Sequence, residues 1–156
     1  MIVILSIIKS LYNLLILRLS FPKEYNDKII QMDDGLNFRI FRHMKLSAPT
    51  LQKKGSILIV RFKFKKFSHQ INKRLSNIPI LLIAGFPGFK DKLWVIDEKS
   101  GFWQGIYLWE NKEAIEEYKH SFVLRIMNKR TKSDTISFKI VNDINLDEFI
   151  KCKILS

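Results

Sequence analysis

The sequence predicts an α+β fold with strands and helices in the order β-α-β-β-α-β. Three kinds of pattern lead to this fold: strands in which apolar and polar residues alternate, two segments with apolar residues at helical spacing, and turn-forming residues between them. The patterns run from about Gly55 to Asn142. In this order, four antiparallel strands bury one face of their sheet under two helices, which is the ferredoxin-like arrangement.

A strand and a helix open this domain. Residues 56–65 alternate between apolar and basic side chains, and one face of the strand would carry Leu58, Val60, Phe62 and Phe64. Ser68 is placed to cap a helix, and the apolar stripe of that helix would be Ile71, Leu75 and Ile78. Because proline lacks an N–H donor, Pro79 is expected to end or kink the helix.

A hairpin, a second helix and a last strand complete the domain. Residues 89–97 and 102–109 have the pattern of two strands joined by a turn. Asn111 is expected to cap a helix that runs to about Asn128. A last strand covers residues 135–142, and a short helix follows it near the C-terminus.

Residues 1–21 form a separate apolar segment, in which Lys9 and Arg18 are the only charged side chains. About 20 apolar residues are needed to cross a bilayer, so spanning is marginal. Three states stay open: a single-pass anchor, a helix lying in the membrane interface, and a buried helix of the fold. Membrane attachment is the favoured interpretation, and the basic residues that follow would keep the next domain on the cytoplasmic side.

Residues 22–54 contain a predicted hairpin and a linker. Two short apolar segments, 28–32 and 36–42, flank the turn Asp33-Asp34-Gly35, and an Asp-Gly pair suits the positive φ angles of a tight turn. Serine, proline and lysine residues then indicate a linker. The chain is therefore expected to divide into an apolar helix (1–21), a hairpin with its linker (22–54) and a main domain (55–156).

The charge balance restricts the class of partner. The chain of 156 residues has 27 Lys and Arg against 15 Asp and Glu, a net charge of +12. Such an excess favours acidic surroundings such as anionic lipid, nucleic acid or a negatively charged ligand. Nucleic acid is not expected, because the third strand of the domain departs from the aromatic pattern of RNA-recognition strands.

The sequence has no motif for metal, cofactor or disulfide chemistry. Its three histidines, His43, His69 and His120, are far apart and lie in no metal-ligand spacing. Neither a glycine-rich nucleotide motif nor a nucleophilic-serine motif is present. Cys152 is the only cysteine, which excludes an intramolecular disulfide. We therefore predict neither a metal nor a cofactor.

Two motifs resemble the YdhR-like mono-oxygenase family of the dimeric α/β-barrel superfamily: Pro87-Gly-Phe-Lys-Asp-Lys-Leu-Trp94, and Gly105-Ile-Tyr-Leu-Trp109 followed by Asn111 and Ala114. The resemblance covers the domain but neither the N-terminal segment nor the hairpin. It implies a homodimer whose two sheets face each other, with a small pocket between each sheet and its helices. Such a dimer would cover the second face of the sheet, where we expect Trp and Tyr side chains. Gly105 is expected where another group approaches the backbone closely.

The resemblance implies cofactor-independent oxygenation, in which a phenolic or quinol-like substrate is deprotonated and reacts with oxygen itself. Arg125 is the candidate for stabilising the substrate anion, and Tyr107 is the candidate for hydrogen-bonding it. A surface ion pair and a packed interface tyrosine are the respective alternatives. The candidates for binding a small aromatic ligand are Phe62, Trp94, Trp103, Tyr107 and Trp109.

A second class of function stays open. A non-catalytic binding module at the membrane would hold anionic lipid or a small acidic ligand through a basic surface at Arg125, Lys129, Arg130 and Lys132. Salt-dependent binding to liposomes would favour the module, whereas oxygen consumption with an aromatic substrate would favour the enzyme.

Overall fold

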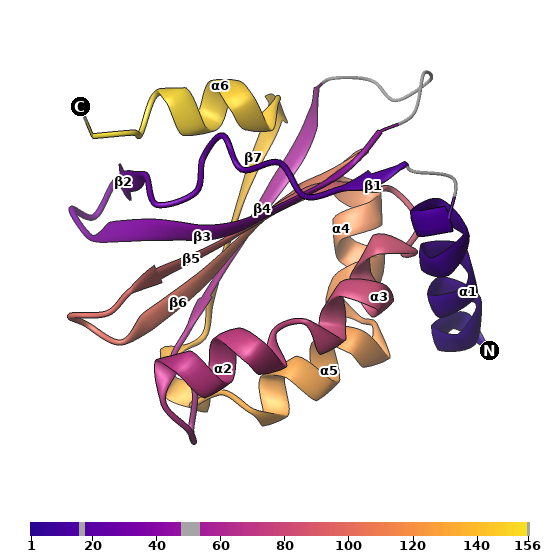
Figure 1. Cartoon of the computed structure of the whole chain (residues 1–156), viewed down its shortest axis with the longest axis horizontal. Coiled ribbons are helices and arrows are strands. Elements are labelled where there is room, and N and C mark those ends of the chain that lie inside the picture. Colours follow the sequence, from indigo (N-terminus) through magenta and orange to yellow (C-terminus); the bar gives the residue numbers. More distant parts are fainter. Residues whose placement is uncertain (16–17, 48–53, 156) are drawn as a thin grey trace.

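The computed structural model describes residues 1–15, 18–47 and 54–155, which form a seven-stranded antiparallel sheet with helices on both faces (Figure 1). The strands are β1 (Leu19–Ser20), β2 (Ile29–Gln31), β3 (Asn37–Leu46), β4 (Gly55–Phe62), β5 (Phe89–Asp97), β6 (Phe102–Trp109) and β7 (Ser137–Ile144). The helices are α1 (Ile2–Leu15), α2 (His69–Leu75), α3 (Ile78–Ala84), α4 (Lys112–Lys119), α5 (Phe122–Lys129) and α6 (Leu146–Lys151), with a 3-10 turn, η1, at Ser133–Thr135.

The four strands of the predicted domain follow the predicted order. Strand β5 pairs with β6, β6 with β4, and β4 with β7. This is the strand order of a ferredoxin-like β-α-β-β-α-β unit, so the predicted α+β fold is confirmed. The bounds of β5 and β6 are those predicted, whereas β7 begins two residues later because η1 occupies residues 133–135.

Each of the two predicted helices is broken into two. The first breaks at Ser76 and Asn77. Pro79 lies in the first turn of α3, where backbone N–H groups make no hydrogen bond within the helix, so a proline costs no hydrogen bond there. The predicted end or kink at Pro79 therefore falls earlier, at Ser76 and Asn77, and Pro79 lies inside the helix that follows. The second breaks at Ser121, whose hydroxyl accepts a hydrogen bond from the N–H of Leu124 and so caps α5.

The predicted hairpin of residues 28–42 is confirmed, but its second strand is longer. Strands β2 and β3 pair on either side of a turn in which Gly35 has a φ of 81°. Strand β3 then continues to Leu46 and pairs along β5, which adds a further strand to the sheet. Residues 22–47 are thus part of the main fold, while the predicted linker at residues 48–53 lies outside the described residues.

Two apolar clusters lie on opposite faces of the sheet. On the face that α2, α3, α4 and α5 cover, β6 places Trp103, Tyr107 and Trp109. On the other face β6 places Ile106 and Leu108, which pack with aliphatic side chains of β4 and β5. The expectation that Trp and Tyr side chains lie opposite the helices is therefore wrong, because alternation along β6 puts all three of them under the helices.

The chain itself covers the second face. Helix α6 packs Leu146, Phe149 and Ile150 onto it, and each of them is 6% exposed or less. The buried Tyr25 extends this cover, and its hydroxyl donates a hydrogen bond to Asp147 at 2.8 Å. Figure 1 shows α6 on the opposite side of the sheet from α2 and α5. A homodimer with facing sheets stays a prediction, and α6 occupies its expected interface.

Helix α1 packs against α3 by one side only. The buried Ser6 hydroxyl donates a hydrogen bond to the carbonyl oxygen of Leu82 at 2.5 Å, and Figure 1 shows the two helices beside each other. Several large apolar side chains of α1 are exposed: Ile4, Leu5, Ile8, Leu11 and Tyr12. Within the described residues, no helix is long and apolar enough to cross a membrane.

Truncating Phe149 tests whether α6 belongs to the core. We expect Phe149→Ala to lower the free energy of unfolding by about 3 kcal/mol, because it removes a buried ring from a closed cluster. Urea denaturation measures this change. The control Lys151→Ala alters an exposed residue of the same helix and should change stability by less than about 0.5 kcal/mol. Equal effects of the two substitutions would show that α6 does not seal the sheet.

Candidate functional site

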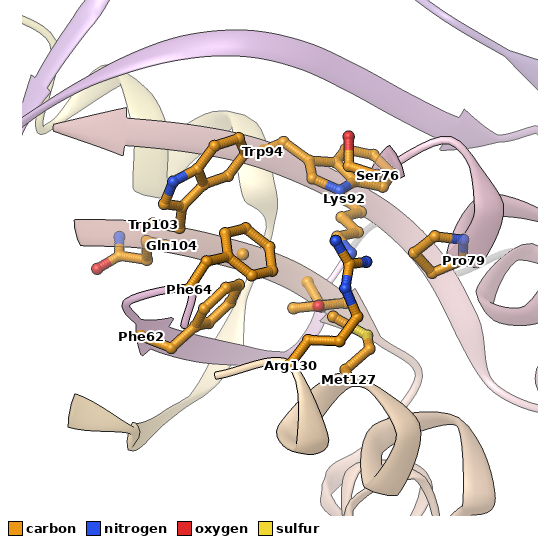
Figure 2. Close-up of a pocket in the computed structure, with 12 residues that line it drawn as sticks. Phe62, Phe64, Ser76, Pro79, Lys92, Trp94, Trp103, Gln104, Met127 and Arg130 are labelled. Carbon is orange, nitrogen blue, oxygen red and sulfur yellow. The ribbon is translucent and has the colours of Figure 1, made fainter. Parts of the chain in front are cut away.

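A small cavity lies between the helix-covered face of the sheet and the helices α2, α3 and α5, with a volume of about 30 Å³. Figure 2 shows how its lining side chains converge from the sheet and from the helices. They are Phe62, Phe64, Ser76, Pro79, Lys92, Trp94, Trp103, Gln104, Gly105, Tyr107, Met127 and Arg130. Five of these twelve residues are aromatic, and a lysine and an arginine are the charged members.

Strand pairing brings the central side chains of the cavity together. Lys92 on β5 lies opposite Tyr107 on β6, and Trp94 lies opposite Gly105. A Cβ atom on Gly105 would lie 2.5 Å from the Tyr107 ring, so only glycine leaves room for the ring there. The predicted close approach at Gly105 is confirmed, and the group that approaches is the Tyr107 side chain.

Lys92 is the least expected residue of the cavity, because its side chain is almost completely buried. Only 1% of the residue is exposed. Its Nζ atom lies 4.0 Å from the ring centroid of Trp94 and 4.1 Å from that of Tyr107. Among the described residues, no carboxylate forms a salt bridge with this amine. Two aromatic faces are therefore its main electrostatic partners.

Burial changes the acid–base behaviour of Lys92. Loss of solvation, followed by the nearby positive charge of Arg42, lowers the pKa of the Lys92 ammonium well below its ordinary value. The ring faces attract the charged form and oppose part of this shift. A lysine with a lowered pKa takes up a proton from a substrate more readily at neutral pH than an exposed lysine, which is already charged.

Arg130 lies at the helix side of the cavity. Its guanidinium carbon is 5.0 Å from the ring centroid of Phe64, and its Nη2 donates a hydrogen bond to Oδ1 of Asn72 at 3.2 Å. Burial lowers the pKa of Arg130, but an arginine stays charged in proteins. None of the described lining residues is acidic. An anionic group in the cavity would therefore meet two basic side chains, Lys92 and Arg130.

The Tyr107 side chain is held in place by other aromatic rings. It stacks on Trp109 with a centroid distance of 6.4 Å and lies 5.7 Å from the ring of Tyr118. Desolvation raises the pKa of Tyr107 above its ordinary value, so its phenol stays protonated at neutral pH. The hydroxyl can therefore donate a hydrogen bond to a bound anion.

Comparison with known proteins shows the family of the chain. Residues 57–146, more than half of the chain, match the family model described as "Putative mono-oxygenase ydhR". The chain belongs to this family. The family resemblance seen in the two sequence motifs is thereby confirmed. No curated protein matches the chain.

Solved structures share the fold of this YdhR-family chain. A monooxygenase-like protein from Listeria innocua has a TM-score of 0.54 at 10% identity, with 78% of this chain and 81% of that protein covered. A ferredoxin-fold protein from Listeria monocytogenes, related to antibiotic biosynthesis monooxygenases, has a TM-score of 0.52 at 12% identity, with 82% and 93% covered. A heme-degrading enzyme from Listeria monocytogenes has a TM-score of 0.53 at 12% identity, with 81% and 97% covered. At these identities the likeness shows the fold alone.

The structure brings together most of the ligand-binding candidates predicted for this YdhR-family chain. Four of them line the cavity: Phe62, Trp94, Trp103 and Tyr107. Trp109 lies behind Tyr107 in the core and is not part of the lining. Arg125 is exposed on α5 and is also absent from the lining, whereas Arg130, five residues further on, lies there. The basic residue at the cavity on the helix side is thus Arg130.

Because of a β-bulge, the alternation of side chains along β5 does not predict on which face Lys92 lies. Strict alternation from Phe89 would place Asp91 and Leu93 on the same face as Phe89. The register shifts between Phe89 and Asp91, and Lys92 and Trp94 lie on that face instead. The available signal was a lysine two residues before Trp94, in phase with the apolar side chains that follow.

A histidine also supports the cavity from α2. Nε1 of Trp103 donates a hydrogen bond to Nδ1 of His69 at 3.0 Å, which holds the indole at the cavity. Within the part of the chain that the structure describes, no group of three or more His, Cys, Asp or Glu side chains is placed to hold a metal ion.

Replacing Lys92 by methionine should stabilise the protein in a pH-dependent way. Because the folded-state pKa of Lys92 is below its unfolded value, folding is penalised at pH values below the unfolded pKa, and the penalty disappears as the pH rises through that value. We expect Lys92→Met to raise Tm by about 2–4 °C or more at pH 7, which corresponds to at least about 1 kcal/mol. The gain should shrink toward pH 10.5, the ordinary value for lysine.

Calorimetric scans of both proteins between pH 7 and the alkaline limit of the fold would measure this difference. The control Lys129→Met changes an exposed lysine on α5 and should leave Tm within about 1 °C of the unaltered protein. A Tm difference for Lys92→Met that does not vary with pH would contradict the lowered pKa.

Proposed function

We propose that this YdhR-family protein binds a small phenolic or quinol-like molecule at Lys92 and promotes its oxygenation by molecular oxygen without an added cofactor. The observation that carries the proposal is the buried amine of Lys92 between the faces of Trp94 and Tyr107. Membership of a mono-oxygenase family supports the choice of reaction. A buried base beside aromatic rings suits a flat, weakly acidic substrate.

The first step would be removal of the substrate hydroxyl proton by the neutral amine of Lys92. This transfer turns the amine into an ammonium and the phenol into a phenolate, so the two charges form together in a place where water is excluded. Arg130 would stabilise the same anion from the helix side, and the Tyr107 hydroxyl would donate a hydrogen bond to it. Arg130 thereby takes the role that the sequence suggested for Arg125.

Oxygen would then react with the electron-rich ring. Electron transfer from the phenolate to oxygen and a new C–O bond at a ring carbon give a peroxide anion, which takes the proton back from Lys92. Cleavage of the C–H bond at that carbon and of the O–O bond releases water and leaves a quinone. For a simple phenol, one phenol and one oxygen molecule give one benzoquinone and one water, so oxygen is both the oxidant and the source of the new oxygen atom.

Access to the cavity would require movement on its helix side. A cavity of about 150 Å³ holds a benzene ring, which is far more than the 30 Å³ present. The side chains of Phe64, Met127 and Arg130 belong to the part of the lining outside β4, β5 and β6, and a shift of these three would widen the space without breaking the sheet. A porphyrin is much larger, so the substrate named for the heme-degrading relative is not part of the proposal.

A non-catalytic binding module is the second candidate. Lys92 and Arg130 are two basic groups at a cavity whose described lining has no acid, and this would suit a small aromatic carboxylate as well as a phenolate. The two candidates share the site and differ in whether oxygen is consumed.

Oxygen uptake with 1-naphthol as the probe separates the two candidates. We expect one oxygen molecule consumed per 1-naphthol, with formation of the naphthoquinone, and a loss of about 100-fold or more in rate for Lys92→Met because the general base is removed. Tyr107→Phe should lower the rate less, since the anion keeps both basic groups. Arg125→Met is the matched control, and it should leave the rate unchanged because Arg125 is exposed and outside the lining.

Tryptophan fluorescence reports binding in the same samples, because Trp94 and Trp103 line the cavity. Quenching by 1-naphthol or 1-naphthoate without oxygen uptake would favour the binding module. Turnover that survives Lys92→Met would overturn the role given to the lysine, and the absence of both quenching and uptake would overturn the site.

A further inference from the structure

The outer side of α1 is apolar although it faces away from the protein. The side chains at helical spacing along this side are 44% to 94% exposed: Met1, Ile4, Leu5, Ile8, Leu11 and Tyr12. Ser6, on the inner side, is buried against α3. A helix of 14 residues is about 21 Å long, so this stripe is a long apolar surface. Exposed apolar surfaces of this kind mark a site of contact with another apolar body.

Apolar side chains are also exposed on the neighbouring helices. They are Phe67, Ile71, Ile78, Phe122 and Ile126, on or beside α2, α3 and α5. Figure 1 places α1, α2, α3 and α5 on the same side of the sheet, away from α6. We call the exposed side chains of these four helices and of Phe67 the helix-side surface.

The helix-side surface has basic residues and no acidic ones. No Asp or Glu occurs in residues 1–23, 35–90 or 118–133, the three segments that contain α1, α2, α3 and α5. The exposed basic side chains in these helices include Lys9, Arg74, Arg125 and Lys129. The acidic residues of the helix layer are confined to α4, at Glu113, Glu116 and Glu117.

We propose that the helix-side surface docks on an anionic lipid bilayer, with the apolar stripe of α1 buried in the headgroup region and the basic residues beside the headgroups. Amphipathic helices bind bilayers by apolar burial together with attraction to anionic lipid. Each Lys or Arg held near such a surface adds to this attraction. A second copy of the chain would present the same positive charge, so charge favours the bilayer as the occupant.

The docked orientation has a consequence for the ligand, and this part rests on the proposed function. Ser76 and Pro79, at the junction of α2 and α3, line the cavity on one side, and Met127 and Arg130, at the end of α5, line it on the other. Three of the four docking helices, α2, α3 and α5, therefore lie at the border of the cavity. A phenolic ligand dissolved in the bilayer would reach Lys92 by passing between them.

Flotation of the full-length protein with lipid vesicles tests the docking surface. We expect binding to vesicles with about 30% phosphatidylserine, weaker binding to phosphatidylcholine alone, and a loss of the difference at about 0.5 M salt. The double substitution Ile4→Glu and Ile8→Glu should weaken binding at least about tenfold, because it places charge on the apolar stripe. The matched control is Ile29→Glu, which alters an isoleucine of comparable exposure on β2.

A second pair of substitutions tests the charges without touching α1. Arg125→Glu together with Lys129→Glu should weaken binding to phosphatidylserine vesicles and leave binding to phosphatidylcholine unchanged. Full binding by both double variants would overturn the proposal. So would a wild-type dimer that Ile4→Glu with Ile8→Glu converts to a monomer in light scattering, because a second copy would then be the occupant.

Lys92→Met separates this inference from the proposed function. It should bind vesicles as the unaltered protein does, since Lys92 is buried and outside the helix-side surface. In the unaltered protein, normal vesicle binding without any turnover of 1-naphthol would overturn the oxygenase and leave the docking surface standing. Turnover by the unaltered protein in solution, without vesicle binding, would overturn the docking surface and leave the oxygenase standing.

Discussion

The register of β5 against β6 is the constraint on which the cavity depends. The hairpin closes through Gly101, which has a φ of 77° and donates its N–H to the carbonyl oxygen of Asp97 at 2.9 Å. This turn fixes Lys92 opposite Tyr107. Because side chains alternate between the faces of a strand, a slip of one residue would move Lys92 to the face under α6 and put an aliphatic side chain in its place.

One face of the sheet contains the candidate site, and the other face mainly stabilises the fold. A buried lysine without a carboxylate partner lowers the free energy of unfolding, even with aromatic faces beside it. The opposite face has a largely aliphatic cluster that α6 and the buried Tyr25 cover from within the same chain. That cluster stabilises the fold without any ligand. The helix-covered face can therefore hold a buried lysine that lowers the free energy of unfolding.

The sequence was sufficient for the strand order, because this order follows from local alternation and turn chemistry. It also named most of the aromatic lining, although the Trp and Tyr side chains were expected on the opposite face. Alternation alone could not locate Lys92, since the bulge after Phe89 changes the phase of β5. Nor did the short helix that starts at Leu146 reveal that it would cover the second face, because such a contact joins segments far apart in the sequence. Arg125 and Arg130 are both basic residues near the end of one helix, and the sequence does not distinguish them. In the structure only Arg130 of the two lines the cavity.

Sealing of the second face also changes where an external partner would bind. With that face covered by α6, the exposed apolar stripe lies on α1, next to helices that have basic side chains and no acids. A neutral phenol partitions into a bilayer, whereas its phenolate does not, because desolvating the charge is costly. A base placed inside a cavity bordered by the docking helices would therefore generate the anion only after the ligand has left the lipid. On the two proposals together, the buried amine and the apolar stripe would be two parts of one route for the ligand.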